Sequence, residues 1–185
     1  MATVDEFGIS DFDLCGLSLG GQVALRIALD HPGRVKRLAA CATGAKIGGA
    51  EGWNARIDAV KAGGMASIAE LALSRFFAPG FGERDPAAYA ASLQTLSEVD
   101  AEAYIACCEA LRDGDLREEV KQLRLPTLLL AGAEDVSTPP ATLGELEQAI
   151  PGSRLEVLPG AAHILALEAP DAVTELIESF LDSAR

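Results

Sequence analysis

Hydrophobic residues along this chain gather into four short runs, which alternate with longer stretches that mix apolar and polar positions. The runs are rich in Leu, Val, Ala and Cys and have the length of buried strands. They occupy residues 12–15, 35–41, 127–131 and 154–158. The last mixed stretch, residues 173–181, repeats apolar residues at the spacing of one helix face. Strands that alternate with helices predict an α/β fold with a parallel sheet and right-handed crossovers.

The second and third runs lie too far apart for a single crossover helix. Residues 42–126 separate them, and much of that interval has a helical composition broken by turns such as Asp85-Pro86. The predicted helices there are residues 53–62, 66–77, 101–111 and 116–123. We therefore expect a core made of residues 1–44 and 124–185, with a helical lid of residues 45–123 inserted into it.

The composition limits the possible classes of protein. The chain has 185 residues, of which 49% are hydrophobic, enough for one substantial core. Its formal net charge of −13 argues against nucleic-acid binding, which needs clustered Lys and Arg. No apolar run is long enough to span a membrane, and the first residues lack the pattern of a signal peptide. These features predict a cytoplasmic protein with no nucleic-acid or membrane partner.

The four cysteines give no sign of a metal centre or a disulfide framework. Cys15, Cys41, Cys107 and Cys108 form no C-x-x-C pair, and no histidine lies at zinc-ligand spacing from them. Cys15 and Cys41 fall inside apolar runs, where cysteine behaves as a small hydrophobe. We expect reduced thiols, no metal site and no cofactor.

A candidate nucleophile follows the first run. Residues 16–20 have the pattern G-x-S-x-G, and they stand between a strand-like run and a helical stretch of small residues. In a nucleophile elbow the serine sits on a sharp strand-to-helix turn, and the residues two before and two after crowd against it. Glycine is therefore expected to be required at both Gly16 and Gly20. Ser18 is the candidate nucleophile.

A serine nucleophile needs a base and usually a carboxylate that orients this base. His163 follows the last run, at the carboxyl edge of the predicted sheet, whereas His31 ends the helix after the elbow and is interpreted as a helix cap. Asp135 follows the third run and is preferred over its neighbour Glu134 as the carboxylate. The order Ser18, Asp135, His163 is that of α/β-hydrolases.

With these residues in place, the chain resembles the α/β-hydrolase superfamily and, within it, the 3-oxoadipate enol-lactonases of bacterial aromatic catabolism. The resemblance covers essentially the whole chain and rests on four segments that follow the family's order. They are residues 15–21, 53–58, 135–140 and 161–163. The first and third are shared by many hydrolases, whereas the Trp-Asn-Ala-Arg segment that begins at Trp53 is more particular to the enol-lactonases.

The resemblance implies a serine hydrolase that opens the ring of 3-oxoadipate enol-lactone in the β-ketoadipate pathway. Leu19 would supply one oxyanion-hole N–H from its backbone. Trp53 and Arg56 in the lid would bind the substrate, a small lactone or ester that carries a carboxylate, with Arg56 as its cationic partner.

The resemblance also implies that family members are longer at the amino end. The chain is expected to begin inside the helix before the elbow strand, without the first strands of the sheet. The loop that donates the second oxyanion-hole N–H would be absent as well. The exposed sheet edge would favour pairing with another polypeptide, including a second copy of the chain.

Other interpretations stay open. Esterases, non-haem haloperoxidases and carbon–carbon hydrolases share the elbow and the order of the three residues. Some proteins of this fold bind ligands or partners without turnover. The same pattern is also compatible with an ordinary Gly-rich turn at Ser18 and a loop histidine at His163.

Overall fold

A parallel sheet organises the chain. The computed structural model describes residues 1–182. In this part of the chain the strands are β1 (Phe12–Leu17), β2 (Val35–Cys41), β3 (Thr127–Gly132) and β4 (Arg154–Leu158). They pair in the order β1-β2-β3-β4, with every neighbouring pair parallel. The predicted α/β class is confirmed, and each of the four apolar runs forms a strand.

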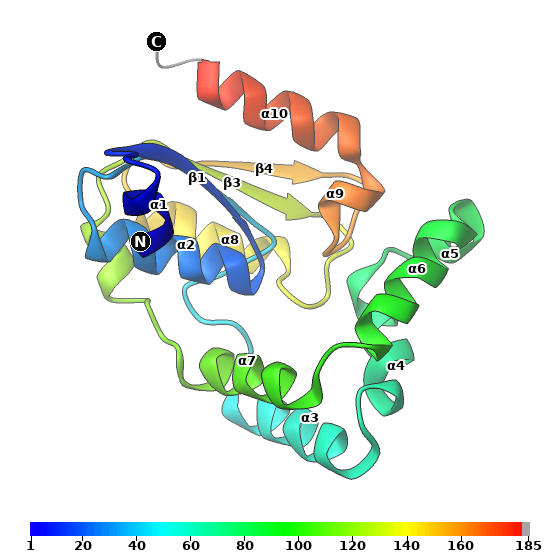
Figure 1. Cartoon of the computed structure of the whole chain (residues 1–185). Helices are drawn as coiled ribbons and strands as arrows, with labels where there is room; N and C mark the ends of the chain where they lie inside the picture. Colours follow the sequence, from blue (N-terminus) through cyan, green and yellow to red (C-terminus); the bar gives the residue numbers. More distant parts are fainter. Residues whose placement is uncertain (183–185) are drawn as a thin grey trace.

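Helices cover both faces of this sheet (Figure 1). Those outside the long interval between β2 and β3 are α1 (Ala2–Glu6), α2 (Leu19–Asp30), α8 (Pro140–Ala149), α9 (Leu165–Glu168) and α10 (Pro170–Asp182). Helix α10 lies on one side of the sheet, and α2 and α8 lie on the other. Leu129 of β3 packs in the cluster that includes α2 and α8, whereas Leu128 and Leu130 pack toward α10. Because β3 is buried on both faces, it reads as a continuous apolar run.

The interval between β2 and β3 is largely helical. It contains α3 (Ala50–Gly63), α4 (Ala66–Phe76), α5 (Phe81–Arg84), α6 (Pro86–Ser97), α7 (Ala101–Asp113) and the short 3₁₀ helix η1 (Glu119–Gln122). Helices α3 to α7 form a group set apart from the sheet (Figure 1), with small apolar clusters of their own around Ile68 and Phe77. We call residues 45–123 the lid, and their division from the core stays a prediction.

Two lid segments differ from the sequence prediction. Asp85-Pro86 separates α5 from α6 as predicted, but helix α6 itself was not predicted. It begins there because the Asp85 carboxylate accepts the Ala88 N–H at 2.9 Å and proline is favoured in a first helical turn. Residues 116–123, predicted as a helix, form only the 3₁₀ turn η1. Leu116 and Val120 of this segment are buried in the core cluster, so packing replaces a regular helix there.

Strand β1 stands at the end of the strand order and pairs only with β2 in the described part of the chain. Its residue Cys15 is exposed, whereas Cys41 of β2 is buried. The expectation that this edge pairs with another polypeptide stays a prediction. Among residues 1–182, no helix is long and apolar enough to cross a membrane.

Candidate active site

The turn after β1 holds Ser18 in an unusual backbone conformation. Its φ of 56° and ψ of −120° lie outside the regions that most residues adopt, as expected for an elbow serine. Two hydrogen bonds maintain the turn: the Ser18 N–H donates to the carbonyl of Cys41 at 2.9 Å, and the Thr43 hydroxyl donates to the Ser18 carbonyl at 2.7 Å. Residues of strand β2 and of the loop after it therefore stabilise the strained backbone of Ser18.

Only one of the two elbow glycines is needed for space. A Cβ on Gly16 would overlap the backbone carbonyl of Gly20 and come within 2.8 Å of the Gly21 nitrogen. A Cβ on Gly20 would meet no atom within 4 Å. The expectation that Gly20 is sterically required is wrong, because this residue already lies in the first turn of α2 with its Cα facing outward.

The side chains of Ser18, His163 and Asp135 form one hydrogen-bonded line. His163 Nε2 lies 2.8 Å from Ser18 Oγ, and His163 Nδ1 lies 2.8 Å from Asp135 Oδ2. His163 and Asp135 are each only 3% exposed. In this arrangement the imidazole can accept the serine proton while the carboxylate orients the ring and stabilises its charged form.

The Asp135 carboxylate also accepts hydrogen bonds from Ser137 and Thr138. One carboxylate oxygen accepts the backbone N–H groups of Ser137 at 2.7 Å and Thr138 at 3.0 Å, and the other accepts the Thr138 hydroxyl at 2.8 Å. Burial opposes ionisation, but the hydrogen bond and charge of His163 and the bonds from Thr138 outweigh it and hold the pKa of Asp135 below its ordinary value. The carboxylate is thus kept charged beside the imidazole.

The alternatives within the chain are not part of this line. His31 follows the last residue of α2, and its backbone N–H bonds the carbonyl of Ile27, as its interpretation as a helix end requires. Glu134, the neighbour of Asp135, is exposed.

Leu19 is the first residue of α2, where a backbone N–H has no acceptor within the helix and stays available for an oxyanion.

Trp53 and Arg56 lie on α3 and contact each other instead of the Ser18–His163–Asp135 line. The Arg56 guanidinium stands 5.5 Å from the centre of the Trp53 ring and 3.4 Å from the Tyr104 hydroxyl of α7. The Trp53 ring N–H donates to the Ile47 carbonyl at 2.7 Å. Within residues 1–182, no carboxylate is within ion-pair distance of Arg56.

Two residues that the sequence analysis did not single out reach the histidine loop. Phe76, the last residue of α4, stacks its ring on His163 with centroids 5.1 Å apart, and its carbonyl accepts the His163 N–H at 3.0 Å. The Glu168 side chain is fully buried, and its carboxylate accepts a backbone N–H of the same loop. A single carboxylate in the apolar stretch of residues 164–169 was the available signal, because a lone charge there has to find partners.

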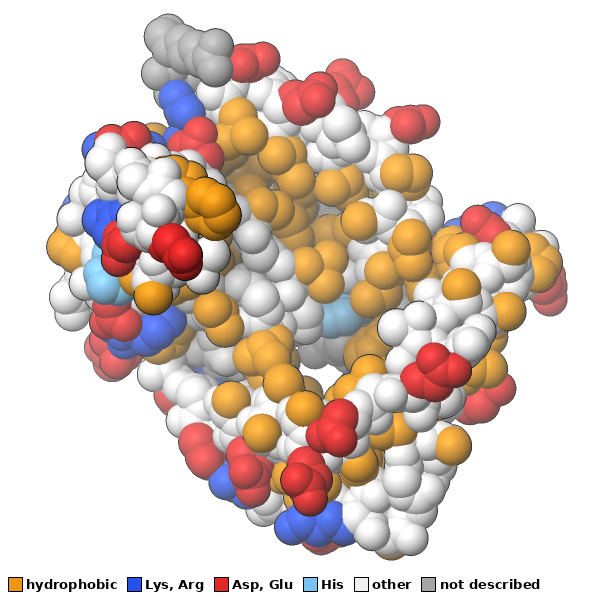
Figure 2. Space-filling view, in the orientation of Figure 1, with side chains coloured by type: hydrophobic (Ala, Val, Ile, Leu, Met, Phe, Trp, Pro, Cys, Tyr) orange, Lys and Arg blue, Asp and Glu red, His pale blue; other side chains and the backbone are white. Residues whose placement is uncertain are grey.

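An apolar cavity of about 360 Å³ opens between α4, α6 and α9. Phe76 and Ile164, the latter next to His163, form part of its wall, and Ser92 and Thr95 are the polar residues of its lining. Figure 2 shows hydrophobic side chains gathered along the hollow between the lid and the sheet. The cavity thus adjoins the candidate base and suits an apolar group.

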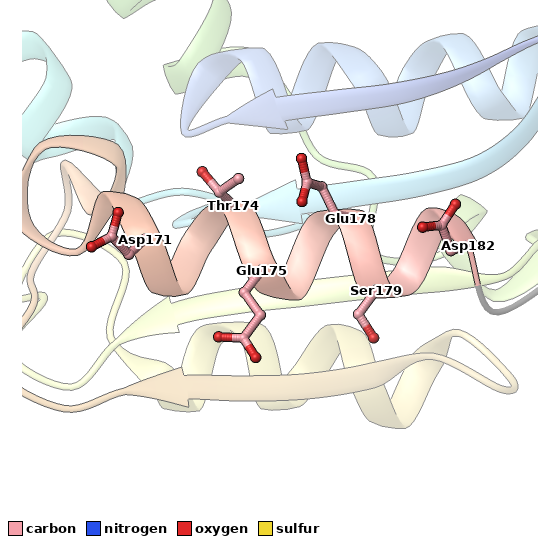
Figure 3. A pocket seen from close by; sticks show the side chains of 6 residues that line it. All are labelled: Asp171, Thr174, Glu175, Glu178, Ser179 and Asp182. Atoms are coloured by element: carbon pink, nitrogen blue, oxygen red, sulfur yellow. The ribbon is translucent and has the colours of Figure 1, made fainter.

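A second hollow runs along the outer face of α10 and does not resemble a site. Its lining is acidic, with Asp171, Glu175, Glu178 and Asp182 among the residues involved. Figure 3 shows that Glu175 and Glu178 point in opposite directions from the helix. In the described residues no group of three or more His, Cys, Asp or Glu side chains could hold a metal ion.

The fold and the hydrogen-bonded serine, histidine and aspartate are those of an α/β-hydrolase. The profile of the "Alpha/beta hydrolase family" matches residues 2–176, and the chain belongs to this family. It is 36% identical over 181 residues to 3-oxoadipate enol-lactonase 2 of Acinetobacter baylyi, and the aligned region covers 98% of this chain and 67% of that protein. It is 33% identical to the pimeloyl-[acyl-carrier protein] methyl ester esterase of Pectobacterium atrosepticum, with 89% and 68% covered.

The structural comparison agrees. The crystal structure of the enol-lactonase from Burkholderia xenovorans LB400 matches with a TM-score of 0.93 and 36% identity, over 97% of this chain and 68% of that one. The chain thus spans about two thirds of the length of these relatives. The resemblance predicted from the four sequence segments is confirmed, and a hydrolase is the class that the relatives support.

Proposed function

We propose that the chain is a serine hydrolase that opens 3-oxoadipate enol-lactone to 3-oxoadipate in aromatic catabolism. The observation that carries the hydrolase proposal is the line of two 2.8 Å contacts from Ser18 through His163 to Asp135. The lactone is suggested by two relatives: the Acinetobacter baylyi protein is named a 3-oxoadipate enol-lactonase, and the Burkholderia xenovorans protein is named an enol-lactonase. No cofactor takes part in the proposed reaction.

In this proposal Ser18 Oγ attacks the lactone carbonyl while its proton passes to His163 Nε2. The Leu19 N–H donates to the resulting oxyanion. When the ring C–O bond breaks, the departing enol oxygen takes the proton back from His163, and an acyl-enzyme remains. His163 then deprotonates a water molecule that attacks the acyl carbon, and it returns this proton to Ser18 Oγ as the ester bond breaks and the acid leaves. The enol of the released acid tautomerises to the ketone. Asp135 orients the imidazole in both halves of the reaction.

Trp53 and Arg56 are the proposed binding residues for the substrate's free carboxylate. Arg56 is part-buried against Tyr104 and lacks a carboxylate partner among the described residues, so its charge is available to an anion. The Trp53 ring beneath the guanidinium restricts its motion. Because neither residue contacts the triad, this assignment requires the substrate to extend from Ser18 toward α3.

The apolar cavity beside His163 favours a second candidate, an esterase for substrates with an apolar acyl or alcohol group. No charged side chain lines the cavity within the described residues. A relative named for a methyl ester of pimeloyl-[acyl-carrier protein] is 33% identical. This candidate would use the same triad chemistry and would not need Arg56.

The first experiment is intact mass after incubation with a fluorophosphonate, on the parent and on Ser18→Ala and His163→Ala. One adduct on the parent that both substitutions abolish would support the proposal that Ser18 and His163 react as a pair. A folded parent that forms no adduct would contradict the proposed hydrolase and favour a ligand-binding role.

The second experiment separates the two substrates. Turnover of the enol-lactone and of p-nitrophenyl esters is compared in the parent, in Arg56→Ala and in Arg154→Ala, whose arginine lies at the exposed start of β4. A rise in KM for the lactone in Arg56→Ala alone would support the lactonase. Ester turnover without lactone turnover, unchanged by Arg56→Ala, would favour the esterase.

A further inference from the structure

Glu168 is a buried carboxylate that joins the lid to the histidine loop. It ends α9, five residues after His163, and its side chain is fully buried. One of its oxygens accepts the Ala78 N–H of the lid at 2.7 Å, and the other accepts the Ala162 N–H at 2.7 Å. The same carboxylate thus binds the residue before His163 and a lid residue far away in the sequence.

A second connection runs parallel to the first. The carbonyl of Phe76, two residues before Ala78, accepts the N–H groups of His163 at 3.0 Å and Ile164 at 3.2 Å. The Phe76 ring also stacks on the imidazole, with an angle of 25° between the two planes. Residues 76–78 and 162–164 are therefore tied by two direct hydrogen bonds and by two more that pass through the Glu168 carboxylate.

The chemistry of this carboxylate argues against a merely space-filling role. A buried charge costs folding free energy unless several good hydrogen bonds compensate it. Here the compensation comes from two short, charge-assisted bonds to backbone N–H groups. The only basic side chain within ion-pair distance in the described chain is Arg84, at 3.9 Å and itself 53% exposed, so it contributes little.

We propose that Glu168 is a positioning residue, which acts through the backbone of Ala162 and Ala78 to hold the His163 imidazole between Ser18 and Asp135. The inference rests on the proposed function in taking His163 as the base. Because effective catalysis needs the base within a fraction of an ångström of its productive position, a loosened loop would slow the serine's reaction and not the binding of substrate. The lid is thereby coupled to the catalytic histidine.

Glu168→Gln tests the link with a change of one atom. The amide oxygen can still accept one N–H, but the NH₂ group would face the other N–H, so one of the two bonds is lost. Glu178→Gln is the matched control, because Glu178 is exposed on α10. This substitution removes one negative charge, as Glu168→Gln does. Arg84→Ala removes the distant cation and leaves both hydrogen bonds in place.

Amide hydrogen exchange measured by NMR tests the coupling between the lid and the histidine loop, and it does not require turnover. In Glu168→Gln we expect exchange to accelerate by about tenfold or more at whichever of Ala78 and Ala162 loses its acceptor, and exchange at His163 and Ile164 to accelerate with it. Both control variants should exchange like the parent. Faster exchange at Ala78 or Ala162 with unchanged exchange at His163 and Ile164 would overturn the proposal.

The rate of fluorophosphonate labelling at Ser18 reads the position of the base. We expect Glu168→Gln to label about tenfold more slowly or worse, with kcat lowered and KM retained on any ester that the parent hydrolyses. Labelling at the parental rate would overturn the proposal. If the parent itself does not label, the proposed function fails while hydrogen exchange still decides the coupling.

Glu168→Asp covers the case in which the glutamine variant does not fold. Aspartate retains the charge but is one methylene shorter, so it can reach only one of the two N–H groups. We expect slower labelling and faster exchange in one of the two segments, together with His163. Parental values in both measurements would contradict the positioning role.

Discussion

The hydroxyl of Thr138 donates a 2.8 Å hydrogen bond to the Asp135 carboxylate, and the backbone N–H of Thr138 donates a second one of 3.0 Å. Both residues are buried, Thr138 to 1% and Asp135 to 3% exposure. The Thr138 hydroxyl also stands 3.3 Å from His163 Nδ1. Thr138 is therefore a partner of the whole aspartate–histidine pair.

Thr138→Val should destabilise the protein. Valine has a similar shape but no hydroxyl, so Asp135 loses a hydrogen bond to a buried charge, which is worth about 1.5–3 kcal/mol. Urea unfolding at neutral pH measures the difference. Thr138→Ser keeps the hydroxyl and is expected to retain most of the stability, and equal losses in the two variants would contradict the assigned bond.

The stability of the protein should fall in acid through Asp135. Its pKa is lowered in the folded state, so the unfolded chain binds the proton more readily. The stabilisation is fully present above the ordinary carboxyl pKa of about 4 and is lost as the pH falls through the lower folded value. Unfolding free energies between pH 6 and pH 3 should therefore change more steeply in the parent than in Asp135→Asn. Parallel curves would contradict this prediction.

Gly16→Ala and Gly20→Ala should differ sharply, although both glycines belong to the same motif. The methyl group at position 16 would overlap the Gly20 carbonyl, and backbone atoms cannot yield cheaply, so we expect a loss of about 2–3 kcal/mol or a failure to fold. Position 20 lies open in the first turn of α2, where alanine is about 0.5–1 kcal/mol better than glycine. Thermal unfolding of the two variants makes the comparison, and equal effects would count against the elbow geometry.

Cys15 should react with alkylating reagents at lower pH than an ordinary thiol. A hydrogen bond from the Cys41 side chain outweighs partial burial and lowers the pKa of Cys15 to about 7. The same pairing, together with burial, raises the pKa of Cys41. Because the thiolate is the reactive form, iodoacetamide labelling of the Cys15 peptide should show a midpoint near pH 7.

Cys41→Ala provides the control for that measurement. Without the donor, the midpoint for Cys15 should move upward toward the ordinary thiol range. A midpoint that stays near pH 7 would show that another group stabilises the thiolate.

Much of the core could be predicted from short stretches of sequence. The apolar runs became strands because buried parallel strands leave little choice of side chain, as Leu128, Leu129 and Leu130 show. The placement of Ser18, Asp135 and His163 after three different strands predicted that they would meet, since parallel strands end at a common edge. Their catalytic roles are proposals that rest on this meeting.

Other features required the three-dimensional packing. The sequence pattern could not show that Gly20 lies open while Gly16 is crowded, because that depends on the angle between β1 and α2. Nor could it pair Glu168 with Ala78, or Phe76 with His163, since these contacts join the lid to a loop far along the chain.

The difference has a physical cause. Hydrophobic periodicity and turn chemistry act between residues that are close in the sequence, so the residues alone indicate the strands and the elbow. The common edge follows from the rule that parallel strands end on the same side of a sheet. Which lid residue lies against the histidine loop is decided by how the helices between β2 and β3 pack. That packing depends on many weak, long-range contacts at once, and only the folded chain brings Ala78 to Glu168 and Phe76 to His163.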